Sequence, residues 1–181
     1  MGEPLMVVLL LAVLAVPAVI VARSARRLGR TARRVERLSL WAEPRGWRVL
    51  GADLTMIGRW QCPPFTASER DVRDGLVGEH RGRQATSLRL VADGEVFHVL
   101  TVELRRVLPV TQVMTAGVPA PELGAGGDRL AERAPERWSM RLERGVLVGW
   151  LPGEPLLALL EDYLDLLADV AERFESLDTT T

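Results

Sequence analysis

Lysine is missing from this sequence, and all 23 basic residues are arginine. Cysteine occurs once, at Cys62, and histidine twice, at His80 and His98. These counts exclude a disulfide framework and a Cys/His zinc cage. The formal net charge of −1 excludes a polycation, so no nucleic-acid partner is expected. The chain has 181 residues, of which 48% are hydrophobic, and this is enough for one folded domain with accessory segments.

The longest uncharged run lies near the start of the chain, at residues 6–22 (MVVLLLAVLAVPAVIVA). As a helix, this run with Leu5 extends roughly 27 Å, close to a hydrocarbon core of about 30 Å. We therefore expect residues 1–22 to form a transmembrane helix. A signal peptide that is cleaved before secretion and a buried core helix are the alternatives. The retained span is favoured because the preceding residues include Glu3 but no base, and because Val21-Ala22-Arg23 is a poor cleavage context.

Arginines follow the apolar run directly. Residues 1–37 carry seven arginines against two acids, whereas residues 38–181 carry 16 arginines against 22 acids. Bases that flank a span stay on the cytoplasmic side, so we expect a single-pass cell-membrane protein with its N-terminus outside and its domain in the cytoplasm. Each base near an anionic bilayer adds about 1 kcal/mol of attraction. The expected contacts with the membrane surface are Arg23, Arg26, Arg27, Arg30, Arg33 and Arg34.

Residues 23–43 are expected to form an Arg-rich juxtamembrane helix. Leu28, Val35 and Leu38 recur at helical spacing with arginines between them. Pro44 and Gly46 then end the helix. A solvated segment that faces anionic lipid is favoured, and a specific acidic-lipid or nucleic-acid site is the alternative.

From residue 44 to residue 176 the pattern indicates an α+β domain. Alternating apolar residues predict an antiparallel sheet of about 5–6 strands, with Asp93-Gly94 and Arg144-Gly145 as hairpin turns. Residues 118–135 contain a small glycine cluster without a phosphate-binding pattern and are expected to be a linker or long loop. The expected strands are residues 72–80, 84–91, 95–103, 137–143 and 146–151, with residues 47–50 and 112–118 as the candidates for a further strand.

The end of the chain predicts an amphipathic helix over about residues 155–176. Its apolar stripe is expected to pack on one face of the sheet and close the domain, with a coiled-coil partner as the alternative. The other face of the sheet is expected to stay wet, and residues 177–181 are expected to be a disordered tail. The opposite side of the helix carries acids that are expected to be solvent-exposed: Glu161, Asp162, Asp165, Asp169, Glu172 and Glu175.

Candidate catalytic groups are few. In a simple meander, one strand separates His80 from His98, which places them about 10 Å apart. Each is therefore expected to be a half-exposed strand residue and not a ligand of a shared metal. Asp71 and Asp74 are the best placed carboxylate pair, and Cys62 is expected to be a small buried hydrophobe. Core packing is the expected role of Trp138. No catalytic residue, metal site or cofactor is predicted.

The order of several short motifs resembles a family of uncharacterised, membrane-anchored actinobacterial proteins of unknown function. The resemblance covers most of residues 1–176 and implies the same N-terminal span, Arg-rich segment and small domain, but no activity. This sequence is shorter than that family between about residues 123 and 138. The matching motifs are Gly46-Trp47, Pro64-Phe65, Gly82-Arg83, Leu108-Pro109, Trp150-Leu151-Pro152-Gly153 and the segment 166–173 (LLADVAER).

These observations favour a membrane-tethered, non-enzymatic interaction or regulatory module with an unknown protein partner. The alternative is a domain that binds a small molecule or lipid headgroup at the inner membrane face, in a cleft between sheet and helix. An enzyme of unrecognised chemistry is the third hypothesis. A deep polar pocket lined by His80, His98 or several arginines favours the second or third, and a filled core with a flat, apolar exposed patch favours the first.

Overall fold

The computed structural model describes residues 31–51, 58–109, 111–121 and 125–177. The expected transmembrane segment, residues 1–22, lies outside this range, as do Arg23, Arg26, Arg27, Arg30 and residues 178–181 of the expected tail. None of the described helices is both long and apolar enough to cross a bilayer. The chain divides into two units, Met1–Leu38 and Ser39–Thr181. Residues 31–42 are helical, within the range expected for the juxtamembrane helix.

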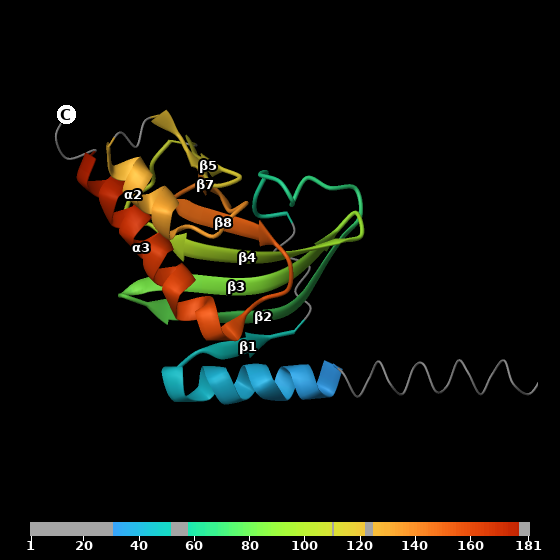
Figure 1. Cartoon of the computed structure of the whole chain (residues 1–181). Coiled ribbons are helices and arrows are strands. Elements are labelled where there is room, and N and C mark those ends of the chain that lie inside the picture. The colour runs from blue at the N-terminus through green and yellow to red at the C-terminus, as the bar shows by residue number, and fades with distance from the viewer. Residues whose placement is uncertain (1–30, 52–57, 110, 122–124, 178–181) are drawn as a thin grey trace, which may run out of the picture. The chain divides into compact units, whose positions relative to one another are not determined.

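The second unit is built on an antiparallel sheet of eight strands (Figure 1). The strand order is β1-β2-β3-β4-β8-β7-β5-β6, so the sheet is open, and the β7–β8 hairpin lies between β4 and β5. The strands are β1 (Arg48–Leu50), β2 (Arg70–His80), β3 (Arg83–Ala92), β4 (Glu95–Glu103), β5 (Thr111–Thr115), β6 (Val118–Pro119), β7 (Ser139–Glu143) and β8 (Val146–Pro152).

The α+β class is confirmed, but the expected number of 5–6 strands was too small. Residues 112–118, expected as one strand, fold back on themselves to give β5 and β6. The reversal occurs at Ala116 and Gly117, which have φ angles of 48° and 85°. Two consecutive residues in this left-handed region make the tight turn that joins hairpin strands. The expected turns at Asp93-Gly94 and Arg144-Gly145 have the same geometry and are confirmed.

Within residues 43–177, as far as the structure describes them, two helices and two short 3-10 turns accompany the sheet. They are η1 (Glu43–Arg45), α2 (Ala125–Arg133), η4 (Leu157–Leu159) and α3 (Leu160–Leu177). The prediction of a linker over residues 118–135 was wrong, because α2 lies within it. Glycines in that segment indicate flexibility by propensity, but the buried side chain of Leu130 anchors the helix. The C-terminal helix begins later than expected, since Leu156 is extended.

Helix α3 crosses one face of the sheet, here called the helix face (Figure 1). Strand alternation places His98 and Leu100 on this face. The ring of Tyr163 in α3 lies 6.1 Å from that of His98 and 5.2 Å from that of Trp138, between ring centroids. Trp138 is fully buried, which confirms its expected role in the core.

The opposite face, here called the loop face, was expected to be wet, and this was wrong. Residues 58–67 cover much of it, and Trp60, Cys62 and Phe65 pack with Val99 and Trp150 in one buried cluster. Periodicity shows only which residues of a strand share a face. It does not indicate that an irregular segment covers that face. The burial of Cys62 is confirmed.

Candidate functional site

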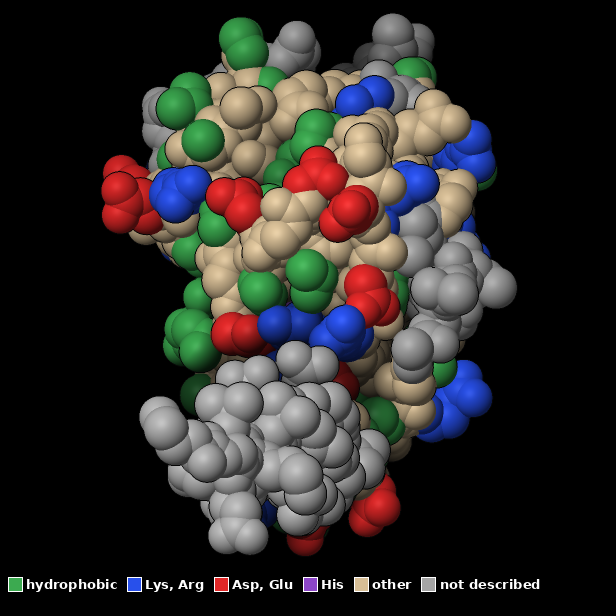
Figure 2. Space-filling model, turned by 90° about the vertical axis from the view of Figure 1, so that its right-hand side faces the viewer, with side chains coloured by type: hydrophobic (Ala, Val, Ile, Leu, Met, Phe, Trp, Pro, Cys, Tyr) green, Lys and Arg blue, Asp and Glu red, His purple; other side chains and the backbone are tan. Residues whose placement is uncertain are grey.

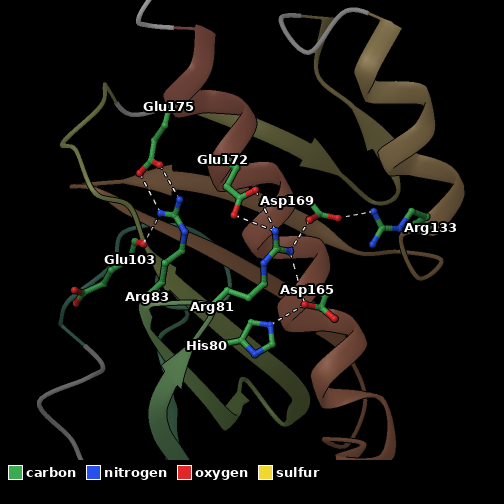
Figure 3. Close-up of polar contacts among 9 residues, drawn as sticks. All are labelled: His80, Arg81, Arg83, Glu103, Arg133, Asp165, Asp169, Glu172 and Glu175. Carbon is green, nitrogen blue, oxygen red and sulfur yellow. Dashed lines mark hydrogen bonds and ion pairs between the residues drawn. The ribbon is translucent and has the colours of Figure 1, made fainter.

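The turn between β2 and β3 meets the acidic side of α3 (Figure 3). His80 Nε2 lies 2.9 Å from Asp165 Oδ1. Arg81 donates from Nη1 to Asp169 Oδ1 at 2.6 Å and from Nη2 to both carboxylate oxygens of Glu172, at 3.0 and 3.1 Å. The spacing of 165, 169 and 172 keeps these acids on one side of the helix. The expectation that these acids are solvent-exposed is confirmed for Glu172, whereas Asp165 and Asp169 are half-buried, and the pairing of the row with the β2–β3 turn was not predicted.

One ion pair between the start of β3 and the end of α3 is buried. Arg83 has a side chain that is 1% exposed, and that of Glu175 is 13% exposed. Arg83 donates from Nη1 and Nη2 to the two carboxylate oxygens of Glu175, at 3.0 and 2.7 Å, and from Nη1 to the carbonyl oxygen of Glu103 at 3.2 Å. These hydrogen bonds from Arg83 hold the pKa of Glu175 below its usual value. The pair ties the end of α3 to the start of β3.

Asp169 joins the β2–β3 turn to α2. Its second carboxylate oxygen accepts a hydrogen bond from Arg133 Nη1 at 2.6 Å. Burial would raise the pKa of Asp169, but the hydrogen bonds from Arg81 and Arg133 outweigh burial and lower it. We call the whole group the acid–arginine cluster. Its arginines are already engaged with protein carboxylates, so the cluster joins three elements and does not form an anion-binding site. Its members are His80, Arg81, Arg83, Arg133, Asp165, Asp169, Glu172 and Glu175.

A second polar group lies beneath α3. Ser87 Oγ is 2.9 Å from His98 Nε2, and both residues are buried. His98 Nδ1 has no hydrogen-bond partner among the described residues. A serine nucleophile needs an accessible oxygen and a histidine oriented by a third group, and this pair has neither. Burial lowers the pKa of His98 to about 4, so the imidazole is neutral at physiological pH.

The expectation that both histidines are half-exposed was correct for His80 and wrong for His98. His80 ends β2 and its side chain is 17% exposed. His98 lies in the middle of β4, which has β3 and β8 on its two sides and α3 above it. As expected from the meander, β3 separates the two histidines. Within the described ranges, no three His, Cys, Asp or Glu side chains are grouped so that they could hold a metal ion.

Acidification from about pH 7 to pH 4 is expected to lower the free energy of unfolding by about 3 kcal/mol through His98 alone. In the unfolded chain, His98 takes up a proton near its ordinary pKa of 6.5. In the folded domain, His98 takes up that proton only near pH 4. The unfolded state therefore binds more protons across this window, and stability falls as the pH falls through it. Urea unfolding at a series of pH values measures the effect.

A His98→Gln variant is the matched control, because its amide can keep a hydrogen bond to Ser87 without titrating. Its stability should be flat between about pH 6.5 and 5. Asp169 and Glu175, whose folded pKa values are lowered, lose their contribution only as the pH falls below the unfolded values of 3.8 and 4.5. If the free energy of unfolding changed with pH equally in wild type and variant above that range, the pH dependence could not be assigned to His98.

The other candidate groups are also engaged. Burial, followed by the charge of Glu143, raises the pKa of Cys62 to about 12, so its thiol stays protonated and unreactive. Asp71 accepts a hydrogen bond from Arg73 Nε at 2.5 Å, and its side chain is 40% exposed. Asp74 lies at the bulge of β2 with a φ of 55°. Hydrolysis needs carboxylates that converge in a cleft, and Asp71 is instead a paired surface group.

An open hollow lies at the β5–β6 edge of the sheet, with a volume of about 630 Å³. Gln112 donates from Nε2 to the carbonyl oxygens of Met114 and Met140, at 2.7 and 3.0 Å. Thr111 Oγ1 donates to the carbonyl oxygen of Pro109. Among the described residues the lining is uncharged and consists of Thr111, Gln112, Thr115, Val118, Pro119, Ala120 and Pro121.

Two of the six expected membrane contacts lie within the described helix. Arg33 is exposed and Arg34 is half-buried. The contact of the six arginines with lipid remains a prediction. Sequence reasoning missed the acid–arginine cluster, although a signal was present. The acids of α3 repeat at intervals of four and three residues, and the predicted turn at residues 80–83 (HRGR) carries opposite charge.

The outer surface of the domain is mixed in character on the side shown in Figure 2. There the hydrophobic side chains are interspersed with acidic and basic ones. Single exposed hydrophobic residues of this kind are normal for folded proteins, so this side does not define a binding surface by hydrophobicity.

These features define a small α+β module, with an open antiparallel sheet, a filled helix face and an ion-paired C-terminal helix. No family model and no curated protein matches the sequence. Among solved structures, the module is similar to the crystal structure of the mycobacterial trehalose monomycolate transport factor A, TtfA. The TM-score is 0.59 at 15% identity, and the match covers 76% of this chain and 92% of that one. At this identity the likeness shows a shared fold.

Proposed function

We propose that this chain is a membrane-tethered, non-enzymatic module that takes part in lipid transport through a protein partner. The observation that carries the proposal is the fold that the domain shares with TtfA over 92% of the TtfA chain. TtfA is a transport factor for trehalose monomycolate, a lipid. The predicted N-terminal span and the arginines after it would hold the domain at the cytoplasmic face of the membrane.

The engaged state of the polar groups supports a docking role over catalysis. His98 is buried under α3, Cys62 is protonated, and Arg81 and Arg83 are paired with carboxylates. An enzyme keeps a nucleophile, acid or base in contact with a space that substrate can enter. The side chains between sheet and helix instead form a packed core, which favours a module that acts by binding.

The hollow at the β5–β6 edge supports a second candidate function, the binding of an uncharged lipid headgroup. Its volume of about 630 Å³ lies in the range of small-molecule sites. The hydroxyl group of Thr115 could donate or accept a hydrogen bond to a sugar-like group, and the hydroxyl oxygen of Thr111 and the amide oxygen of Gln112 could accept one. Under this alternative, the same domain carries the headgroup itself.

Deletion of the gene in the native host is expected to shift a lipid class from the outer envelope to the inner membrane. Full-length protein should restore the distribution, whereas a variant without residues 2–22 should be released from membranes by carbonate and fail to restore it, because the apolar span is the segment that inserts into the bilayer. Lipid analysis of separated membranes and immunoblotting of the fractions measure both effects.

The matched control carries glutamine at all six arginines between Arg23 and Arg34, and keeps the span. It should stay in the membrane but adopt mixed orientations, which protease accessibility of the domain reveals. An unchanged lipid distribution in the deletion strain would refute the transport role. A truncated chain that still pellets with membranes after carbonate extraction would refute the tether.

A further inference from the structure

The connection between β4 and β5 lies across the β7–β8 turn. The backbone N–H of Leu104 donates to the carbonyl oxygen of Gly145 at 2.8 Å. A Cβ at Gly145 would lie 3.4 Å from Val107 Cγ2 and 3.6 Å from the carbonyl oxygen of Arg106. Leu108 is 8% exposed and anchors the far side of the connection in the domain. These contacts hold residues 104–108 in a defined place beside the turn.

This connection presents a hydrophobic tip among arginines. Val107 is 82% exposed, more than any other large hydrophobic residue in the described ranges. Arg105 and Arg106 precede it and are exposed, and Arg144 is exposed in the adjacent turn. Within the described part of the chain, none of these three guanidinium groups has a hydrogen bond or ion pair. We call residues 104–108 together with Arg144 the Arg–Val loop.

Nearby acids offset only part of the positive charge of the loop. Glu175 accepts a hydrogen bond from the backbone N–H of Arg105, and its carboxylate is shared between the charges of Arg83 and Arg105, which both lower its pKa. Glu103 is exposed and is the remaining acid beside the loop in sequence. Three arginines beside one exposed acid and one shared carboxylate leave an excess of positive charge around the exposed valine. Other arginines of the domain, such as Arg81 and Arg89, have carboxylate partners.

We propose that the Arg–Val loop is a second membrane contact, which places Val107 in the headgroup region of an anionic phospholipid bilayer. An apolar tip surrounded by bases is suited to that interface, because the tip leaves water while the bases meet lipid phosphates. The inference rests on the proposed function, since the N-terminal tether brings the domain to the bilayer. With a tether and a loop both attached, the domain faces the membrane in one orientation.

A fluorescent probe tests the contact directly in the full chain. Val107→Cys labelled with nitrobenzoxadiazole should report only the loop, because Cys62 is fully buried. In phosphatidylcholine vesicles that contain phosphatidylglycerol, the emission should shift to the blue, and lipids with spin labels near the headgroup should quench it. In vesicles without anionic lipid both effects should be absent. The same probe at Val118, which is 68% exposed on β6, should stay in water.

The charge variant is Arg105→Gln, Arg106→Gln and Arg144→Gln in the labelled chain. It should weaken the partition of the loop into anionic vesicles on the order of fivefold for each arginine removed. The matched control replaces three other exposed arginines that have no ion pair within the described residues, Arg48, Arg137 and Arg173. That control should leave the probe response unchanged, and circular dichroism confirms that both variants are folded.

The outcomes separate the loop from the tether. If the chain resists carbonate extraction but the probe at position 107 stays in water, the loop proposal is wrong and the tether stands. If carbonate removes the chain but anionic vesicles still quench the probe at neutral pH, the tether is wrong and the loop contact stands. A probe that responds equally to neutral vesicles, or to an acidic polypeptide and not to vesicles, overturns the proposal.

Discussion

Replacing Arg83 by methionine is expected to lower the free energy of unfolding by about 3–5 kcal/mol. The guanidinium group is almost fully buried and neutralises Glu175, whose side chain is 13% exposed. Its removal leaves a carboxylate that has lost most of its water and its ionic partner. It also leaves the carbonyl oxygen of Glu103 without its hydrogen bond from Arg83. Urea unfolding monitored by circular dichroism measures the loss.

Arg133→Met is the matched control, because it breaks an ion pair of the same cluster at the surface. The side chain of Arg133 is 53% exposed, and the expected loss is about 1 kcal/mol or less. Glu175→Gln combined with Arg83→Met should be less destabilising than the sum of the single changes, since the unpaired buried charge is then gone. Equal losses for Arg83→Met and Arg133→Met would mean that burial does not distinguish the two pairs.

Trp138→Ala is expected to lower the free energy of unfolding by about 3–5 kcal/mol, through the loss of a large buried side chain and the cavity left behind. Trp138 is fully buried and contacts Tyr163 of α3. Its indole also lies over Gly149, where an added Cβ would come within 2.6 Å of the indole nitrogen. This side chain therefore joins α3 to β8, and its loss should loosen the helix face.

The contact with Gly149 provides a test that distinguishes direct packing of Trp138 on Gly149 from a simple loss of buried hydrophobic area. Gly149→Ala in the wild type is expected to cost about 1–3 kcal/mol, because the methyl group would overlap the indole. In the Trp138→Ala background the methyl group enters vacated space, so the added cost should be near zero or negative. Gly51→Ala is the control, since a Cβ at Gly51 meets no atom of the described residues within 4 Å. Additive losses at positions 138 and 149 would refute the steric contact.

The acid–arginine cluster affects how the domain could act as a docking module. Asp169 links the β2–β3 turn to α2 through Arg81 and Arg133, and Glu175 holds the end of α3 to β3. These contacts fix both helices relative to the sheet. A partner or a bilayer would therefore meet a preorganised surface, which lowers the entropic cost of binding.

Much of the sheet could be predicted from local patterns. The strand of residues 95–103 alternates apolar residues on two sides, and Asp93-Gly94 supplies the positive φ angles that a tight hairpin requires. The apolar stripe of α3 likewise indicated a helix packed on a sheet. These features depend on residues close together in sequence, whose spacing directly reflects strand and helix geometry.

The candidate sites depended on contacts that spacing does not encode. The acids of α3 looked like a solvent face, because nothing in the helix itself shows that Arg81 and Arg83, more than 80 residues earlier, would meet them. His98 looked half-exposed, because alternation does not show what covers a strand. The Arg–Val loop was also invisible, since the approach of residue 107 to Gly145 is a tertiary contact.

By itself, the sequence determined the α+β class, the main hairpins, the amphipathic final helix and a strong expectation of a membrane tether. It did so because periodicity, turn residues and long apolar runs act over short stretches of chain. Only the tertiary structure decided which charges are paired, which faces are covered and which arginines stay unpaired. Those properties arise when segments far apart in sequence come into contact, and the energy of a charge depends on its neighbours and its burial more than on its residue type.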